Sequence, residues 1–321
     1  MVLRCLIILG ISLRIISLQP FAADLLGAFG VGWDLVGITH IERAPDNAKS
    51  AVTVTAPKGE SFSGLDGEAL KLAAGLCAYP LDVKRLFELL PDTVLAEVRA
   101  PDKERFILWA EDYFYKATGR KVAIKDLSVN SLDGLYQVIE DLGALVGGQV
   151  EARNLVNKIK SQIMSWGHSF FDRSRGKLVV VISDLDPLTV EGRWFPDLIK
   201  ALGARTIEFN CTDPARGLSW ADVVAARPNT IIYAPENQSL EYSVKGLNAL
   251  ESLPNWEDLP AVKRGDVIFA AGRDIYRPGP RFLKGTAILV SAIAGLDSGY
   301  ITERDEYFKV RYLELHRHRF V

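Results

Sequence analysis

Two segments of this 321-residue chain, half its length apart, follow the same plan. Residues 81–98 predict a short helix, a break at Pro91-Asp92 and an apolar strand, and residues 218–235 repeat this order with the break at Pro228-Asn229. The residue before a proline is disfavoured in the helical conformation, and Asp or Asn then favours a turn. Each segment therefore changes from helix to strand at its break. Two such units in one chain predict a protein of two similar α/β halves.

The repeat extends to the start of each half. Residues 13–18 and 177–182 read as apolar strands, and each is followed by a proline-containing loop and a helix that ends near a glycine. The strands are runs of Val, Ile and Leu with little alternation, which is typical of sheets covered by helices on both faces. We therefore predict the α/β class, with two Rossmann-like lobes, mostly parallel sheets and a ligand cleft between the lobes.

Residues 150–172 predict a single long helix between the lobes. Its apolar residues recur at helical spacing and its other positions carry Glu, Arg, Lys and Gln. At ~1.5 Å per residue such a helix would span roughly 35 Å, about the width of a small domain. We expect an N-terminal lobe over residues 14–149, this connecting helix, a C-terminal lobe over 173–296 and a C-terminal tail over 297–321.

Composition excludes several classes of function. Lys and Arg number 38 against 40 Asp and Glu, which gives a net charge of −2 and no dense basic stripe, so we expect no nucleic-acid partner. Cys5, Cys77 and Cys211 are scattered without a Cys-x-x-Cys pair, so neither a disulfide framework nor a zinc site is indicated. We expect a monomer with no intrinsic cofactor.

The first 13 residues are ambiguous. They contain Arg4 and an apolar run from Cys5 to Leu9, which resembles a short signal peptide. No small-x-small cleavage site precedes Arg14, and the run is shorter than the ~20 apolar residues that span a bilayer. A vestigial signal or an extra edge strand both fit this segment. We expect a cytoplasmic protein, or an extracytoplasmic one if residues 1–13 belong to a signal.

Three groups of residues resemble a known family. Trp256–Phe269 and Arg277-Pro-Gly-Pro-Arg281 closely resemble the C-terminal signature of the iron-siderophore and cobalamin class of periplasmic binding proteins. Residues 14–37 resemble the first strand and helix of the same class. Thr39-His40, Leu76–Tyr79 with Asp82-Val83, Asp186-Pro187 and Gly192–Pro196 resemble its signal-less cobalamin-binding branch. The resemblance covers roughly residues 14–296.

The resemblance implies a non-enzymatic protein that holds a cobalamin-like corrinoid in the cleft, with ferric siderophore or haem as alternatives. The partner it implies is an ABC-type permease, on which transport-coupled members dock through one acidic residue per lobe. Here the first-lobe counterpart falls near Lys84, which has the opposite charge. The chain also departs from the cobalamin branch at His40-Ile41-Glu42, where that branch tends to carry His-Glu-Cys.

The position of the ligand follows from the fold class. In open α/β sheets, ligands bind beyond the carboxyl ends of the strands. Aromatic rings suit the flat apolar face of a macrocycle, and Asn, Asp and Arg suit its amide rim. We therefore predict a site built from strand-end loops, with these ligand contacts: Pro20, Phe21, His40, Tyr79, Arg99, Asp186, Trp194, Asn237, Asp274, Tyr276 and Arg277.

Three of these residues have a structural alternative. His40 is predicted as an axial metal ligand of the bound chelate, but a lone histidine at a strand end also serves to close a loop. Trp194 fits a cleft or the lobe core, and Tyr79 fits a stacking role or packing beneath its helix. A chelatase-like enzyme on the same scaffold is a further alternative, for which the chain offers only His40 and scattered carboxylates.

Overall fold

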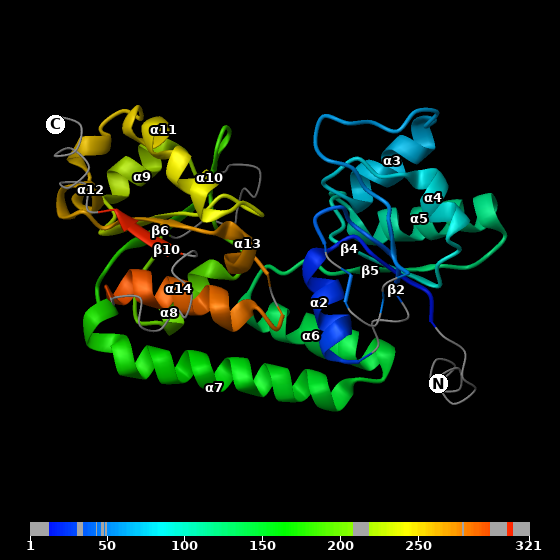
Figure 1. Ribbon diagram of the computed structural model, residues 1–321, viewed down its shortest axis with the longest axis horizontal. Helices are drawn as coiled ribbons and strands as arrows, with labels where there is room; N and C mark the ends of the chain where they lie inside the picture. Colours follow the sequence, from blue (N-terminus) through cyan, green and yellow to red (C-terminus); the bar gives the residue numbers. More distant parts are fainter. Residues whose placement is uncertain are drawn as a thin grey trace. The chain divides into compact units, whose positions relative to one another are not determined.

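The computed structural model describes residues 13–30, 35–42, 44–45, 48, 50–207, 218–277, 279–295 and 307–310; for Asp274 and residues 307–310 it describes the backbone alone. The chain forms two compact units, shown in Figure 1. Lobe 1 comprises Met1–Val129 and Tyr136–Val156, and lobe 2 comprises Asn130–Leu135 and Asn157–Val321. Both lobes are α/β, as predicted.

Lobe 1 contains one five-stranded parallel sheet in the order β3-β2-β1-β4-β5. Its strands are β1 (Ile15–Ser17), β2 (Leu35–Ile38), β3 (Val52–Thr53), β4 (Thr93–Ala96) and β5 (Ala123–Asp126). Its helices are α2 (Pro20–Ala28), α3 (Gly67–Leu76), α4 (Val83–Glu88), α5 (Lys103–Thr118) and most of α6 (Leu132–Val146).

Helices cover both faces of the lobe-1 sheet, which is why its strands lack alternation. Ile16, Val94 and Ile124 pack with buried residues of α3, α4 and α5. Ile15 and Leu95, which point to the other face, are also fully buried. Burial of successive strand residues on opposite faces is expected of a parallel sheet between two helical layers.

Lobe 2 contains a mixed sheet in the order β10-β9-β8-β6-β7. Its three central strands are parallel: β6 (Val179–Leu185), β8 (Thr230–Tyr233) and β9 (Val267–Ala270). Its edge strands, β7 (Leu188–Val190) and β10 (Tyr307–Val310), are antiparallel to their neighbours. The helices are α8 (Phe195–Ala201), α9 (Trp220–Ala226), α10 (Leu240–Lys245), α11 (Leu247–Glu251), η2 (Trp256–Asp258), α12 (Pro260–Arg264), α13 (Gly272–Ile275) and α14 (Phe282–Ala294).

The two edges of the lobe-2 sheet add detail that the repeat did not predict. β6 turns back into β7 through Asp186-Pro187, which are joined by a cis peptide bond. At the other edge, β10 pairs with β9, with Tyr307 opposite Ala270. Part of the predicted tail over 297–321 is therefore a strand of the lobe-2 sheet.

One 26-residue helix, α7 (Gln149–Ser174), occupies the stretch predicted as the connecting helix. The division between the two units falls inside it, between Val156 and Asn157. Because α7 continues through this division, the lobe boundaries at 149 and 173 stay predictions.

The repeated breaks are equivalent down to their hydrogen bonds. Asp92 accepts a bond from the Arg14 backbone N–H (2.9 Å), and Asn229 Oδ1 accepts one from the Leu178 N–H (2.8 Å). The N–H groups of Asp92 and Asn229 in turn donate to the carbonyls of Arg14 and Leu178, both at 2.8 Å. The residues before the two prolines both have positive φ, 43° at Leu90 and 53° at Arg227. Each break therefore ties its strand to the first strand of its own lobe.

Candidate functional site

The carboxyl ends of β1, β2 and β4 lie at one edge of the parallel lobe-1 sheet. His40 follows β2 and is held by Thr55: its backbone N–H donates to Thr55 Oγ1 (2.9 Å), and its ring Nδ1 lies 2.8 Å from the same oxygen. The ring of Tyr79 meets the imidazole edge to face, with centroids 4.9 Å apart. Because Thr55 occupies Nδ1, Nε2 is the ring nitrogen that a metal ion would meet.

The surroundings of His40 favour a neutral imidazole. Burial lowers the pKa of His40 below its ordinary value, and the carboxylate of Glu60 opposes part of this effect. Neutral imidazole is the form that ligates metals. The residue therefore meets the chemical requirement for the predicted axial ligand.

Glu42 lies close to His40 and was missed as a site residue. Its carboxylate accepts bonds from the N–H (2.5 Å) and Oγ1 (2.7 Å) of Thr39, and Ser17 Oγ donates to its other oxygen (3.0 Å). Burial raises the pKa of Glu42 to about 7, an effect that Asp24 reinforces and the Thr39 and Ser17 hydrogen bonds oppose. The Thr39-x-x-Glu42 spacing, that of a capping box, was the signal available in the sequence.

The other predicted residues of lobe 1 differ in exposure. Pro20 is half-buried in the first turn of α2, whereas Phe21 is 7% exposed and belongs to the core. Arg99 is exposed, and its backbone N–H donates to the Gly75 carbonyl (2.9 Å). Of these lobe-1 candidates, His40 and Tyr79 are the pair that the structure brings into ring contact.

Asp126, at the end of β5, fixes the loop that carries Arg99. Its carboxylate accepts bonds from the Val98 N–H (2.9 Å), Lys103 Nζ (2.9 Å) and Ser128 Oγ (2.6 Å). Burial raises the pKa of Asp126, but these hydrogen bonds and the Lys103 charge outweigh it, so the pKa is lowered. Asp126 therefore remains a carboxylate at neutral pH. No sequence motif pointed to this arrangement.

In lobe 2 the predicted aromatic residues are buried. Trp194 is 3% exposed and Tyr276 is 5% exposed, and both pack on Phe195 with ring centroids 5.4 and 5.3 Å away. Burial raises the pKa of Tyr276 well above its ordinary value. The burial of Trp194 agrees with the core alternative for this residue. Ligand contact by either ring stays a prediction.

Arg193 joins the two buried aromatics and was missed by the sequence reasoning. Its guanidinium makes two bonds to one oxygen of buried Glu191 (2.9 and 3.1 Å) and lies 4.9 Å from the Trp194 ring and 5.6 Å from the Tyr276 ring. Burial lowers the pKa of Arg193, but the charges of Glu191 and Glu236 outweigh this and raise it. In the sequence, the only signal for this arrangement was a Glu and an Arg separated by one glycine, and this signal is weak.

Two loops of lobe 2 approach so closely that one position requires glycine. A Cβ atom at Gly272, which opens α13 after β9, would lie 1.9 Å from the carbonyl oxygen of Pro235, which follows β8. Backbone approach of this kind is possible only without a side chain. These loops carry the predicted contacts Asn237 and Tyr276.

The remaining predicted contacts of lobe 2 are polar. Asp186 is exposed at the turn between β6 and β7. Asn237 is half-buried with φ of 60°, and Arg277 is half-buried beyond α13. The side chain of Asp274 lies outside the described residues, as do Cys5 and Cys211. The backbone places all four predicted residues beyond the carboxyl ends of β6, β8 and β9.

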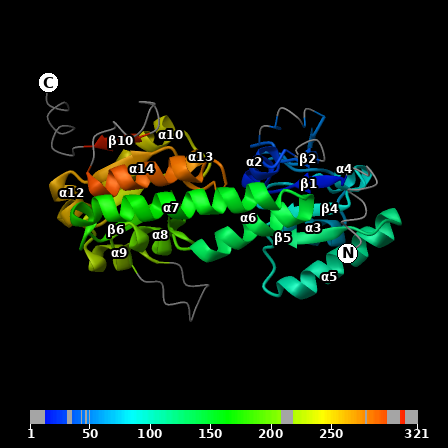
Figure 2. The same ribbon diagram turned by 90° about the horizontal axis from the view of Figure 1, so that it is seen from below.

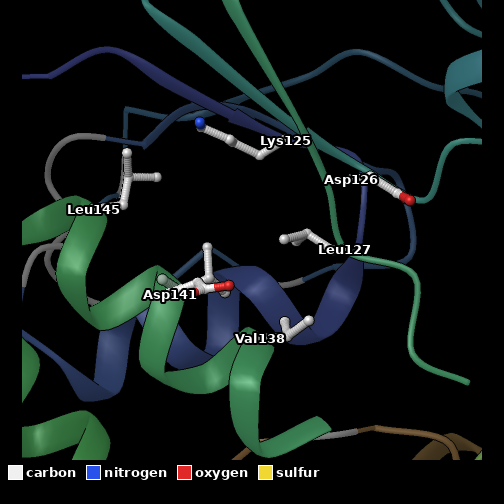
Figure 3. Close-up of a pocket in the computed structure, with 7 residues that line it drawn as sticks. Lys125, Asp126, Leu127, Val138, Asp141 and Leu145 are labelled. Atoms are coloured by element: carbon white, nitrogen blue, oxygen red, sulfur yellow. The ribbon is translucent and has the colours of Figure 1, made fainter. Parts of the chain in front are cut away.

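A pocket of about 310 Å³ lies elsewhere in lobe 1, between β5 and α6 (Figure 3). Figure 3 shows Lys125 and Asp141 on opposite sides of it, with apolar side chains between them and Asp126 pointing away. Its lining residues are Lys125, Asp126, Leu127, Val138, Asp141, Leu142 and Leu145. None of the predicted ligand contacts lines this pocket.

Among the residues that the structure describes, no three His, Cys, Asp or Glu side chains are grouped closely enough to hold a metal ion. No helix in the same ranges is both long and apolar enough to cross a bilayer.

Two doubly wound units joined by one helix, with strand-end loops that carry aromatic and polar side chains, define a bilobal solute-binding protein. The family model described as "Periplasmic binding protein" matches residues 15–273, and the chain belongs to this family. The family resemblance and the bilobal α/β fold expected from the sequence are therefore confirmed.

Individual relatives are distant and cover most of the chain. A vitamin B12-binding protein of Vibrio vulnificus is 20% identical over 278 residues, which are 84% of this chain and 86% of that protein. An uncharacterized ABC transporter substrate-binding lipoprotein of Bacillus subtilis, YvrC, is 22% identical over 288 residues, or 87% and 79% of the two chains. The structure of a periplasmic heme binding protein from Pseudomonas aeruginosa superposes with a TM-score of 0.60 at 16% identity, over 92% of this chain and 95% of that one.

Proposed function

We propose that this protein binds a metal chelate with a flat macrocycle, a cobalamin-like corrinoid or haem, without chemically changing it. A ferric siderophore is the remaining variant within the class. The relatives support this proposal, since one is named for vitamin B12 and another for heme. Beyond the strand ends, both lobes carry polar side chains and lobe 1 carries the aromatic ring of Tyr79, as such a ligand needs.

The observation that carries the proposal is the position of His40. Thr55 holds its Nδ1 and its backbone N–H, and Tyr79 contacts its ring, so the imidazole is fixed before any ligand arrives. A fixed, neutral imidazole with Nε2 available is suited to a cobalt or iron centre. His40 is accordingly proposed as the axial ligand, with Tyr79 and Arg99 as neighbouring contacts.

In lobe 2 we propose a division of roles according to burial. Exposed Asp186 and half-buried Asn237 and Arg277 contact the polar rim of the ligand. Trp194 and Tyr276, packed around Phe195 and Arg193, form the rigid support for these loops. Rigid support lowers the entropic cost of binding.

The proposed partner is an ABC-type importer, because one relative is named as an ABC transporter substrate-binding lipoprotein. The same name and the family description favour an extracytoplasmic location, and the cytoplasmic location expected from residues 1–13 gains no support from them. A monomer without a nucleic-acid partner remains our expectation.

Ligand retention tests the proposal. Purified protein is mixed separately with cyanocobalamin, aquacobalamin, haem and a ferric siderophore, desalted, and measured for visible absorbance. We expect retention of one corrinoid or haem in a saturable manner. If no chelate is retained, the binding function is wrong; if metal is inserted into a free porphyrin, the protein is a chelatase.

The role of His40 has its own test. His40→Ala should shift the visible spectrum of the retained chelate and weaken binding at least about tenfold, since one metal–ligand bond is lost. His168→Ala, at an exposed position of α7, is the matched control and should change neither. An unchanged spectrum in His40→Ala would assign His40 to loop closure.

A further inference from the structure

Helix α7 has one buried side and one uncovered side. Ala152, Val156, Ile159 and Ile163 are fully or almost fully buried and lie on the side that packs against the lobes. Within lobe 2, α8 and α14 lie on one side of α7 (Figure 1), and in the view from below no described helix or strand covers its other side (Figure 2). That uncovered side is therefore available for contact.

The uncovered side carries large apolar side chains at regular spacing. Val150, Met164 and Phe171 are 59%, 73% and 47% exposed. Each is separated from the next by seven residues or a multiple of seven, so all three lie along one side of the helix. From Val150 to Phe171 this line extends about 32 Å at 1.5 Å per residue.

Basic residues share that side. Arg153 lies at the same helical angle as Phe171, Lys160 lies about 20° beyond it, and Arg175 follows the helix end. The Arg175 guanidinium lies 5.8 Å from the Phe171 ring. We call these six residues the outer strip: Val150, Arg153, Lys160, Met164, Phe171 and Arg175. Of the acidic residues of α7, Glu151 is rotated about 100° from Val150, and Asp172 is rotated about 100° from Phe171 and about 40° from Val150.

We propose that the outer strip binds an anionic membrane surface, independently of the proposed chelate site. Basic side chains are attracted to anionic headgroups, and exposed Met, Phe and Val enter the interface. A protein partner would favour contiguous apolar residues with charges at the rim. Here, by contrast, the apolar residues are about 10 Å or more apart with basic residues between them.

The strip is too small for permanent attachment. Stable membrane anchoring takes two signals, of which a short basic and apolar surface is the weaker one. The outer strip therefore provides reversible binding, which depends on the anionic lipid content and decreases as salt screens the charges.

Co-sedimentation of the full-length chain with vesicles tests this inference. Phosphatidylcholine vesicles with and without phosphatidylglycerol are compared at low and high salt. We expect binding to the anionic vesicles at low salt only. Lys160→Glu and Met164→Ser should each lower the partition coefficient of the protein between vesicles and solution. For Lys160→Glu, which reverses a charge, we expect a decrease of about tenfold.

The matched controls lie on α5, which offers the same residue types away from the strip. Arg105→Glu replaces an exposed base, and Leu108→Ser replaces an apolar residue that is 69% exposed. Both should bind vesicles like the wild type. Equal binding to neutral vesicles, unchanged binding by the strip variants, or equal loss in the α5 controls would each overturn the proposal. Absence of vesicle binding would do so as well, and would leave an acidic protein as the better partner.

Discussion

Single polar residues at the strand ends have strong effects in this protein because they are partly or wholly removed from water. Glu42 is the clearest case. Burial and the neighbouring charge of Asp24 place its pKa at about 7 against an ordinary 4.5. A carboxyl group with a raised pKa binds a proton in the folded state at pH values where the unfolded chain has lost it.

Glu42→Gln should therefore change how stability depends on pH. Below pH 4.5 the contribution of Glu42 is fully present; it is lost as pH rises through about 7, because ionisation in the folded state is unfavourable. The loss amounts to at most about 3 kcal/mol. Urea unfolding from pH 4 to pH 8 should show this decline in the wild type and a flatter profile in Glu42→Gln. The same decline in both proteins would show that another group titrates.

Gly272 is a second residue whose substitution should have a large effect. Gly272→Ala places a Cβ atom against the Pro235 carbonyl, so two loops of lobe 2 must separate. We expect a loss of about 2–3 kcal/mol in unfolding free energy and weaker chelate retention. Gly67→Ala is the matched control, because nothing lies within 4 Å of its Cβ position. If both variants retain the chelate equally, the spacing of the two loops is not required for binding.

At the scale of elements, the two helix–break–strand units perform the same task. Asp92 and Asn229 each bond to the chain at the start of the first strand of their lobe, so each unit sets the register of its sheet. The acceptor oxygen is what Asp92 and Asn229 share; Asp92 in addition makes an ion pair with Arg120.

Asp92→Ala and Asn229→Ala should each cost about 1–2 kcal/mol, since each removes the acceptor of a partly buried N–H. Because the two residues lie in different lobes, their effects should be additive in the double variant. Amide exchange should increase in β1 and β4 for the first variant and in β6 and β8 for the second. Asp112→Ala, which removes an exposed ion pair with Lys116, should leave the unfolding free energy close to that of the wild type, because water screens the pair. Faster exchange in the wrong lobe would contradict this assignment.

These elements also show which features of the fold can be predicted from the sequence. Apolar runs such as residues 177–182 and the proline breaks determine local structure, so the α/β class, the central strands and the long helix followed from them. Glu42, Arg193 and Asp126 were missed because their roles depend on partners distant in sequence, such as Ser17, Tyr276 and Lys103. Trp194 carried no local signal for burial, because the aromatic group around it includes Tyr276, which is distant in sequence and packs on Phe195.

At the scale of the whole molecule, the two lobes are similar in their parallel strands and differ in the loops that follow these strands. The parallel strands that the lobes have in common, β1, β4 and β5 in lobe 1 and β6, β8 and β9 in lobe 2, bring strand ends to one edge of each sheet. The loops beyond those edges differ: lobe 1 presents the fixed imidazole of His40, and lobe 2 presents polar residues supported by a buried aromatic group around Arg193. We therefore expect the metal centre to depend on lobe 1 and the rim of the ligand on lobe 2.

Amide hydrogen exchange with and without the retained chelate tests whether both lobes contact the ligand. We expect protection in the loops after the parallel strands of both lobes, near residues 39–42 and 77–81 in lobe 1 and near residues 184–194 and 234–238 in lobe 2. We expect no protection around the pocket between β5 and α6. Protection confined to that pocket, or to one lobe alone, would show that the ligand does not bind to the strand-end loops of both lobes.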